Sequence, residues 1–600
     1  MKNRYHTLII GTGCAGYNAA DRLFDLGVRD IAVITEGRLM GTSRNTGSDK
    51  QTYYKLSLCG KDGDSVREMA DTLYAGGGVM GEHALCEAAY STRCFMRLVE
   101  LGVPFPTNEY GEYAGYKTDH DPRSRATSCG PLTSKYMTEA LERSVLSKGV
   151  ELIDAQRVIK ILTVDNRVIG VACADTETGE ISVIACQNVI LCTGGPAGIY
   201  RNTVYPESQH GATGLAIDVG AALSNMEEWQ YGIASTGFRW NLSGTYQQVL
   251  PRYLSVDENG IEREFLYEAL GDASLGMIFL KGYQWPFDTR KIEGSSKIDL
   301  LVAAEIKKRR RVFLDFTKNP KGLEQGFDVL PKEAYSYLER SGVLFGTPIE
   351  RLKKMNSGAI ALYADHGIDL SVERLEIAVC AQHCNGGVAV DRHWQSEVDG
   401  LYVAGEAAGT FGVYRPGGSA LNSTQVGSLR AAEHIAKRAD RPSPMPEYVP
   451  PSVKYGHSNI EKIRDELQCE MSRVADFDRS TDEMKALFGR VDLLCNTFFE
   501  AVKIDDPTQT AELFKLYDMV LTQRAVLSAM LCSAEAIGTH GSALVDRTPT
   551  RDIDTPRVTR TLTRGAHSEQ APISPMPTPE LWFETLLARQ TTSKASTPVF

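Results

Sequence analysis

The chain has 600 residues, of which 65 are basic and 76 acidic, for a formal net charge of −11. This length is too great for one hydrophobic core and predicts several domains. The acidic balance argues against a nucleic-acid binder, which needs a basic face. No apolar run approaches ~20 residues and the start lacks a signal-like stretch, so we expect no membrane span and a cytoplasmic location.

The 13 cysteines are scattered along the chain and form no CxxC pair or metal-ligand cluster. This pattern predicts free thiols in a reducing compartment, no metal site, and no iron–sulfur cluster held by this chain alone.

The first residues alternate strand, glycine turn, helix and strand. Residues 7–10 are apolar, residues 15–26 have helical spacing, and residues 31–34 are β-branched or apolar. Between the first strand and the helix lies Gly11-x-Gly13-x-x-Gly16, which in this context is a dinucleotide fingerprint. The glycines permit close approach of a pyrophosphate to the free N–H groups of the helix. Glu36 follows the second strand, where an acid accepts hydrogen bonds from a ribose diol.

Further along, changes in composition divide the chain into segments. A loop rich in Gly, Ser, Thr and Asn is followed by amphipathic helices near residues 84–102 and 133–148, and by strands from 150 to 193. Five prolines between residues 442 and 451 indicate a linker. The predicted divisions are 1–234 and 356–440 for one nucleotide-binding domain, 235–355 for an inserted lobe, 441–455 for the linker, 456–545 for a helical domain and 546–600 for an irregular C-terminal tail.

Two later segments narrow the choice of dinucleotide cofactor. Residues 188–195 read as a buried strand ending in Thr-Gly-Gly, and residues 399–406 as a strand ending in Ala-Gly-Glu. Such turns place backbone and an acid beside the rest of a dinucleotide, and no second GxGxxG follows a strand. We therefore expect one FAD and no built-in nicotinamide domain. The helix opened by residues 417–422 would stabilise negative charge on the reduced flavin through its N-terminus.

Over residues 5–545 the chain resembles the fumarate reductase / succinate dehydrogenase flavoprotein family, which includes L-aspartate oxidase. Besides the three segments, the resemblance rests on motifs in family order, namely residues 194–200, 214–221, 226–231, 312–317, 383–388 and 415–421. It implies an α/β fold with a Rossmann-like FAD-binding domain, interrupted by an α+β capping domain and followed by a C-terminal helical domain. The candidate FAD contacts are Gly11, Gly13, Cys14, Ala15, Gly16, Glu36, Gly37, Ser43, Asn45, Thr46, Gly47, Val158, Thr193, Gly194, Gly195, Thr213, Gly405, Glu406, Ser419, Ala420, Leu421 and Asn422.

The resemblance also implies that substrate lies against the flavin beneath the capping domain. Histidine and arginine side chains bind its carboxylates there, and a capping-domain arginine moves the proton. Arg415 and His383 match two of these groups by motif, and Tyr231 lies where the family motif meets substrate. A guanidinium clamps a carboxylate through two parallel hydrogen bonds, whereas an isolated arginine or histidine usually has only a structural role.

Four departures from the family pattern bear on the substrate. Gly232 replaces a carboxylate-binding histidine and should open space, and only Lys297 lies where the proton-delivering arginine is expected. Thr213 replaces the acid of a Gly-Asp-Gly motif. Residues 41–45 lack the histidine that binds flavin covalently in the membrane complexes, so a noncovalent FAD is predicted.

These departures predict a substrate other than fumarate, succinate or aspartate. The leading hypothesis is a hydride transfer between flavin N5 and a small organic substrate with a carboxylate or carbonyl activating group, in either direction. The alternatives are an amino-acid or amine oxidase like L-aspartate oxidase, a flavoprotein subunit that passes electrons to an iron–sulfur partner, and an FAD-binding protein without catalysis. Trp240, Tyr246, Tyr253 and Trp285 of the capping lobe could line the pocket or form its core. The sequence does not give the oligomeric state.

Overall fold

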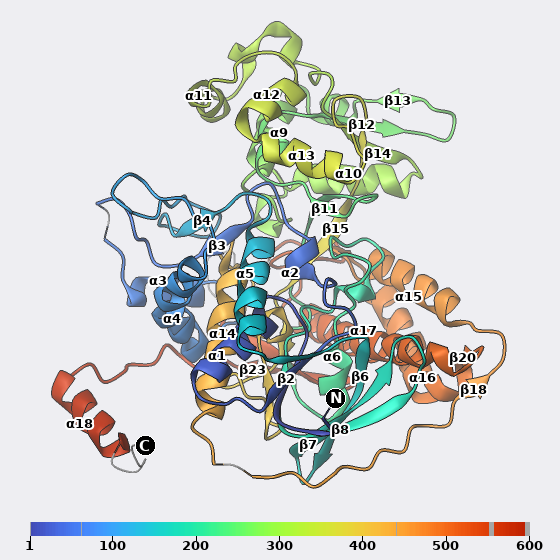
Figure 1. Cartoon of the computed structure of the whole chain (residues 1–600). Coiled ribbons are helices and arrows are strands. Elements are labelled where there is room, and N and C mark those ends of the chain that lie inside the picture. The colour runs from blue at the N-terminus through green and yellow to red at the C-terminus, as the bar shows by residue number, and fades with distance from the viewer. Residues whose placement is uncertain (1, 62, 440, 551–556, 595–600) are drawn as a thin grey trace.

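The computed structural model describes residues 2–61, 63–439, 441–550 and 557–594. Its main body is built on a seven-stranded sheet in the order β5-β2-β1-β8-β7-β6, with β17 paired to β8 (Figure 1). The parallel strands are β1 (Arg4–Ile10), β2 (Ile31–Ile34), β5 (Glu151–Ile153), β8 (Ile181–Leu191) and β17 (Leu401–Val403), and the antiparallel ones are β6 (Gln156–Val164) and β7 (Arg167–Asp175). Their near-continuous apolar sequences fit a sheet that is covered on both faces.

Helices cover the parallel part of this sheet. They are α1 (Cys14–Asp25), α4 (Gly81–Glu100), α5 (Thr133–Ser147) and α14 (Ser419–Ile435), and the shorter elements nearby are α2 (Thr42–Asn45), β3 (Thr52–Tyr54), α3 (Val66–Tyr74), β4 (Ala126–Ser128) and α6 (Thr213–Asp218). Helix α1 packs against both α14 and α5. Helices α4 and α5 correspond closely to the two amphipathic helices predicted from the sequence.

The three glycine-rich segments meet at one edge of the sheet. Ile10 at the end of β1 pairs with Leu191 of β8, and Leu191 pairs with Val403 at the end of β17. All three strands are parallel, so their carboxyl ends lie side by side. Ligands bind at this edge in open α/β sheets, and it is where the sequence segments after each strand converge.

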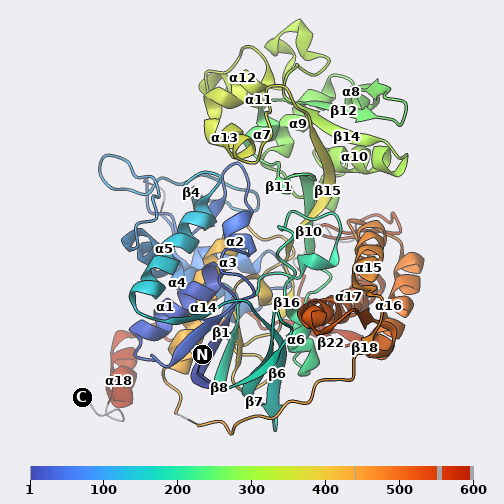
Figure 2. The same cartoon turned by 45° about the vertical axis from the view of Figure 1, so that its right-hand side comes forward.

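A second, six-stranded sheet carries the inserted lobe. Its order is β11 (Trp240–Asn241), β10 (Trp229–Ser235), β15 (Leu375–Cys384), β14 (Arg311–Asp315), β12 (Arg252–Val256) and β13 (Glu262–Arg263). The lobe's helices are α7 (Thr245–Gln248), α8 (Phe265–Leu270), α9 (Ala273–Lys281), α10 (Lys297–Lys307), α11 (Lys332–Arg340), α12 (Pro348–Met355) and α13 (Ser357–Asp365). Strands β10 and β15 run between the lobe and the main body (Figure 2). The chain returns along β15, about twenty residues after the predicted boundary at 355.

The helical domain lies beside the main body on the side opposite α1 (Figure 2). It consists of α15 (Ile460–Val474), α16 (Thr481–Ala501) and α17 (Thr510–Ala536), with the short strands β18 (Lys454–Tyr455), β19 (Asp478–Arg479), β20 (Lys503–Ile504) and β21 (Leu544–Val545). Helix α17 packs against α16 on one side and α6 on the other, and is buried along most of its length. The predicted fold class is confirmed. No helix in the described ranges is both long and apolar enough to cross a bilayer.

The tail predicted to be irregular contains a β-hairpin. Strands β22 (Thr559–Arg564) and β23 (His567–Pro572) extend a sheet with β9 (Leu223–Ser224) and β16 (Gly387–Val388), and α18 (Phe583–Lys594) follows. The hairpin sequence is mostly polar, so it has no apolar pattern from which its strands could be predicted. Residues 551–556 and 595–600 of this predicted tail lie outside the described residues.

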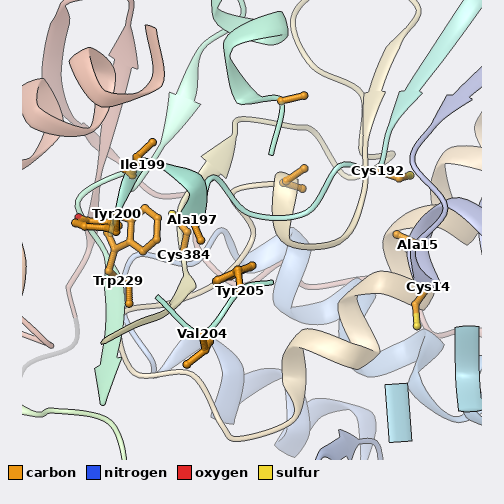
Figure 3. Close-up of a cluster of buried hydrophobic side chains, with 14 of the residues drawn as sticks. Cys14, Ala15, Cys192, Ala197, Ile199, Tyr200, Val204, Tyr205, Trp229 and Cys384 are labelled. Atoms are coloured by element: carbon orange, nitrogen blue, oxygen red, sulfur yellow. The ribbon is translucent and has the colours of Figure 1, made fainter. Parts of the chain in front are cut away.

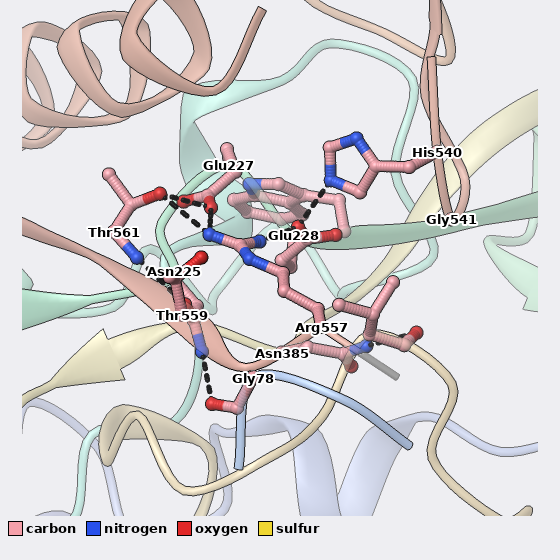
Figure 4. Close-up of polar contacts among 12 residues, drawn as sticks. Gly78, Asn225, Glu227, Glu228, Asn385, His540, Gly541, Arg557, Thr559 and Thr561 are labelled. Carbon is pink, nitrogen blue, oxygen red and sulfur yellow. Dashed lines mark hydrogen bonds and ion pairs between the residues drawn. The ribbon is translucent and has the colours of Figure 1, made fainter. Parts of the chain in front are cut away.

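Buried charge anchors the hairpin to the main body (Figure 4). The Arg557 guanidinium pairs with Glu227 (2.9 Å) and Glu228 (2.5 Å), and its side chain is only 10% exposed. The Thr561 hydroxyl donates a hydrogen bond to the same Glu227 carboxylate. Removing the cation would leave two buried carboxylates with fewer partners, which is costly in a low-dielectric interior.

We therefore expect Arg557→Ala to lower the free energy of unfolding by about 3–5 kcal/mol, measured by denaturant unfolding of the holoprotein. The matched control is Arg564→Ala on the same hairpin, whose half-exposed side chain pairs with Glu397 and contributes about 0–1 kcal/mol. Equal losses in the two variants would contradict this account of how the tail is held.

Candidate active site

The turn between β1 and α1 leaves no room for side chains at two glycines. A Cβ on Gly11, whose φ is +110°, would lie 2.5 Å from the carbonyl oxygen of Cys192, and a Cβ on Gly16 would lie 1.9 Å from the carbonyl oxygen of Gly11. The backbone of β1, the segment after β8 and the helix therefore come together closely. Helix α1 begins after Gly13, which has no side chain to cap it. The Cys14 N–H donates to Ser43 Oγ (3.2 Å), and the N–H groups of Ala15 and Gly16 have no side-chain acceptor among the described residues, so they are available to an anion.

A cavity of about 690 Å³ opens from this turn toward the lobe. The predicted FAD contacts that line it are Gly11, Gly13, Cys14, Ala15, Glu36, Gly37, Ser43, Thr46, Gly47, Val158, Thr193, Gly194, Gly405, Glu406, Ala420 and Leu421. They come from all three segments, from the loop after β2, from β6 and from the start of α14. Among the apolar side chains around the cavity, Cys14, Cys192, Val204 and Tyr205 are buried (Figure 3).

Six predicted contacts do not line the cavity, namely Gly16, Asn45, Gly195, Thr213, Ser419 and Asn422. Several of them instead hold its wall in place. The Asn45 amide donates to the carbonyl oxygens of Leu39 and Gly41, and the Asn422 amide donates to the Glu87 carboxylate (2.9 Å). Sequence spacing placed these residues beside lining residues but did not give the direction of their side chains.

Arg415 and His383 lie together at the lobe end of the cavity. The half-buried Arg415 guanidinium donates to Gln230 Oε1 (2.7 Å), Asn385 Oδ1 (3.2 Å) and Ser419 Oγ (3.4 Å), all of them uncharged groups. Burial lowers the pKa of Arg415 to about 10, which still leaves it charged at neutral pH. A charged guanidinium with only neutral partners is suited to an anionic ligand.

A β-bulge in β15 brings two neighbouring residues to the cavity. Gln230 pairs with His383 but Tyr231 pairs with Ala381, so Gln382 is the extra residue. As a result Gln382 and His383 both line the cavity, although successive residues of a regular strand face opposite sides. Gln230 and Gln382 were not predicted as site residues, and a bulge leaves no signal in the sequence.

His383 presents an unused hydrogen-bond acceptor. The Asn385 amide donates to the Gly412 carbonyl oxygen (2.8 Å), so its Oδ1 accepts from both Arg415 Nε and His383 Nδ1 (3.0 Å). The proton of the imidazole is therefore on Nδ1. Burial and the nearby Arg415 lower the pKa of His383 well below its usual value, so the ring is neutral. Nε2 has no hydrogen-bond partner among the described residues.

The other two predicted catalytic residues do not reach the cavity. The Tyr231 side chain is 1% exposed, and its hydroxyl lies 3.1 Å from both the Tyr200 hydroxyl and the Ala475 carbonyl oxygen. Because strand residues alternate, Gln230 and Gly232 face the cavity side of β10 while Tyr231 faces the helical domain. Lys297 begins α10, where its amine lies 3.8 Å from Glu293. Neither position supports contact with substrate.

The space beside Gly232 is filled by a ring from the lobe. A Cβ on Gly232 would lie 2.8 Å from Cε2 and Cζ2 of Trp285. The expectation that this glycine opens space for substrate is therefore wrong. Trp285 itself lines the cavity, whereas Trp240, Tyr246 and Tyr253 are buried in the core.

Comparison with known proteins identifies the family to which the chain belongs. The sequence model of the family described as FAD binding domain matches residues 6–421. The chain belongs to this family. It is 25% identical over 559 residues to a subunit of the fumarate reductase (CoM/CoB) of Methanothermobacter marburgensis, covering 89% of this chain and 93% of that protein. It is 28% identical over 456 residues to L-aspartate oxidase of Agrobacterium fabrum, covering 73% and 75%.

Solved structures agree on the fold. The E. coli quinol fumarate reductase FrdA superposes with a TM-score of 0.71 at 19% identity, covering 96% of this chain and 98% of that chain. Adenylylsulfate reductase from Archaeoglobus fulgidus gives a TM-score of 0.63 at 14% identity, with 97% of each chain covered. The protein is thus an FAD-dependent oxidoreductase of the fumarate reductase/L-aspartate oxidase family, as the sequence motifs predicted.

The residues around the cavity fit FAD. Thr42 Oγ1, Arg157 Nε and Thr193 Oγ1 are buried, belong to lining residues and have no partner among the described residues. Buried polar atoms are rarely left unpaired, so these atoms are available to the cofactor. No histidine lies among residues 41–45, which agrees with noncovalent FAD.

Glu36 lines the end of the cavity next to β2, where the sequence predicted contact with a ribose. Burial raises its pKa, but Arg157 and Lys515 outweigh burial, so the pKa of Glu36 is lowered and it remains a carboxylate. A carboxylate there accepts hydrogen bonds from ribose hydroxyls. Arg157 and His210 also line this end, and sequence reasoning missed both because they lie on elements far from the glycine motif.

Proposed function

We propose that this enzyme transfers a hydride between flavin N5 and a small organic substrate that carries one carboxylate or carbonyl activating group, as an enoate-type reductase or dehydrogenase. The observation that carries the proposal is Arg415, whose charged guanidinium lines the cavity with only neutral partners. No ion pair to Arg415 forms in the described part of the chain. The nearby carboxyl is that of Glu406, which acts on Arg415 from beyond ion-pair distance, and burial raises the pKa of this carboxyl to about 7.

Fumarate and succinate are poor candidates because each carries two carboxylates. The position of one family histidine is Gly232, which is covered by Trp285, and Lys297 lies outside the cavity. The lysines that line the cavity, Lys50 and Lys117, are exposed. Arg415 is therefore the half-buried cation at the lobe end that would bind a carboxylate.

The chain's residues then have separate roles. Arg415 would bind the carboxylate bidentately and draw electron density from the adjacent double bond. Neutral His383 would accept a hydrogen bond at Nε2 from a substrate or cofactor donor. Helix α14 begins at the cavity, and its N-terminus would stabilise negative charge on a reduced flavin. Bound FAD would supply or accept the hydride, and solvent water reaching the cavity would supply or take up the accompanying proton.

Two alternatives remain for the same cavity. The similarity to L-aspartate oxidase favours an amino-acid or amine oxidase, and hydrogen peroxide formed from an amino acid would support it. The similarity to a protein named as one subunit of the fumarate reductase (CoM/CoB) favours a flavoprotein that passes electrons to an iron–sulfur partner. A stable complex with such a protein would support that alternative.

The deciding experiment is anaerobic. The flavin is reduced chemically and its visible absorbance is followed after mixing with enoates, imines and keto acids. The proposal expects rapid reoxidation by at least one enoate with a single carboxylate. Reoxidation only by imines or by dioxygen would contradict it and favour the amine oxidase.

A further inference from the structure

The indole of Trp285 takes the place of a side chain on β10. A Cβ on Gly232 would lie 2.8 Å from two indole carbons and 3.2 Å from Nε1. Nε1 also donates a long hydrogen bond (3.4 Å) to the carbonyl oxygen of Ile233. The ring is therefore in contact with the strand backbone, and position 232 accepts only glycine while Trp285 stays where it is.

The segment that carries Trp285 is fixed to both neighbouring domains. Phe287 N–H donates to the Tyr231 carbonyl oxygen (2.7 Å), which ties the segment to β10. The Ser542 hydroxyl donates to the Phe287 carbonyl oxygen (2.6 Å), and Thr289 N–H donates to the Gly541 carbonyl oxygen (2.9 Å). Trp285 is thus held in position before any ligand binds, which reduces the entropy lost on binding.

The lobe's side of the cavity is aromatic and carries no cation. The described lobe residues that line it are Asn241, Ser243, Gly244, Gln248, Phe279, Gly282, Tyr283, Trp285, Pro286, Glu333 and Tyr337. Glu333 is the charged member of this set, and it accepts a hydrogen bond from the Tyr283 hydroxyl. A second substrate carboxylate directed at this wall would meet a carboxylate and no positive charge.

We propose that Trp285 is a specificity-determining residue that, in the same cavity as the Arg415 clamp, selects a monocarboxylate with a flat aromatic or apolar substituent. This inference rests on the proposed function and names its substrate class. Arg415 binds the carboxylate, and the far end of the molecule packs against the indole and against the rings of Phe279, Tyr283 and Tyr337, which line the same cavity and contact one another. Aromatic rings pack favourably on one another beyond the area that they bury.

The test compares two enoates that differ only in the far substituent, cinnamate with a phenyl group and crotonate with a methyl group. Their rate constants for reoxidising the anaerobically reduced holoenzyme are measured, together with their dissociation constants from the oxidised enzyme by perturbation of the flavin spectrum. Wild type is expected to prefer cinnamate by at least roughly tenfold. Trp285→Ala is expected to bring the ratio near one, and Trp285→Phe to keep most of the preference.

The matched control is Trp582→Ala, which removes an indole that is 66% exposed on the tail and should leave the ratio unchanged. If Trp285→Ala does not fold, the double variant Gly232→Ala/Trp285→Phe is tested in its place. It is expected to lose the preference for cinnamate, because the new methyl group displaces the ring. Equal binding of the two enoates to wild type, or an unchanged ratio in the variants, would overturn the role of Trp285 but not the proposed function. Failure of every enoate to bind would overturn the proposed function as well.

Discussion

Arg415→Ala should nearly abolish turnover while leaving FAD bound. The guanidinium donates to Gln230, Asn385 and Ser419. Ser419 is a predicted FAD contact, but its hydrogen bond to Arg415 is long (3.4 Å) and it does not line the cavity. Loss of a charge-assisted partner for a desolvated carboxylate costs about 3 kcal/mol or more, which is at least a hundredfold fall in kcat/KM. Steady-state kinetics gives the fall, and the visible flavin spectrum reports on bound cofactor.

Two further variants separate charge from geometry at this position. Arg415→Lys keeps the charge but loses the planar fork, so its activity should lie between those of wild type and Arg415→Ala. Arg438→Ala is the control, because Arg438 lies beyond the other end of α14 and pairs with Asp399 (2.6 Å). Activity of Arg415→Ala within a few-fold of wild type would remove the proposed carboxylate clamp.

Gly16→Ala should cause the protein to lose FAD. The added Cβ would lie 1.9 Å from the carbonyl oxygen of Gly11, so α1 would have to move away from the turn where we expect the pyrophosphate to bind. We expect wild type to be yellow and to release free FAD in acid, and the variant to retain at least tenfold less flavin per chain, roughly the effect of 1.4 kcal/mol. Absorbance after acid precipitation measures both.

The matched control for this prediction is Gly489→Ala in α16, where an added Cβ has no neighbour within 4 Å. Because alanine also favours helix, that variant should keep its flavin and its stability. Gly13→Ala is milder, since its Cβ would lie 3.2 Å from the flexible Ser43 Oγ, and should lose less flavin. Full flavin content in Gly16→Ala would contradict the placement of the pyrophosphate at this turn.

The cofactor half of the site could be predicted because its signals are local in sequence. Strand, glycines, helix and Glu36 lie within one short segment, and each later glycine segment directly follows its own strand. Parallel pairing of β1, β8 and β17 then brings the segments to one edge. The geometry of the sheet thus converts three distant motifs into one cavity.

The substrate half could not be predicted in the same way. Alternation along β10 directs Gln230 and not Tyr231 to the cavity, and the bulge in β15 adds Gln382 beside His383. Trp285 reaches Gly232 across more than fifty residues of chain. These contacts depend on register and on tertiary packing, for which a single sequence has no periodic signal.

The prediction of an irregular C-terminal tail was wrong for a related reason. The hairpin β22–β23 pairs with β9 and is held by Arg557 on Glu227 and Glu228. Its stability therefore depends on partners more than three hundred residues earlier. The buried positions of β22, Thr561 and Thr563, are polar, so the strand lacks the apolar alternation that marks a half-buried strand in a sequence.

One matched pair of substrates tests the single-carboxylate clamp most directly. Fumarate and its monomethyl ester share the same carbon skeleton and differ by one negative charge. The rate of reoxidation of the anaerobically reduced holoenzyme is measured for each under identical conditions. We expect the monoester to reoxidise the flavin faster than fumarate, because the lobe's wall offers no cation to a second carboxylate. Faster reoxidation by fumarate would contradict the clamp.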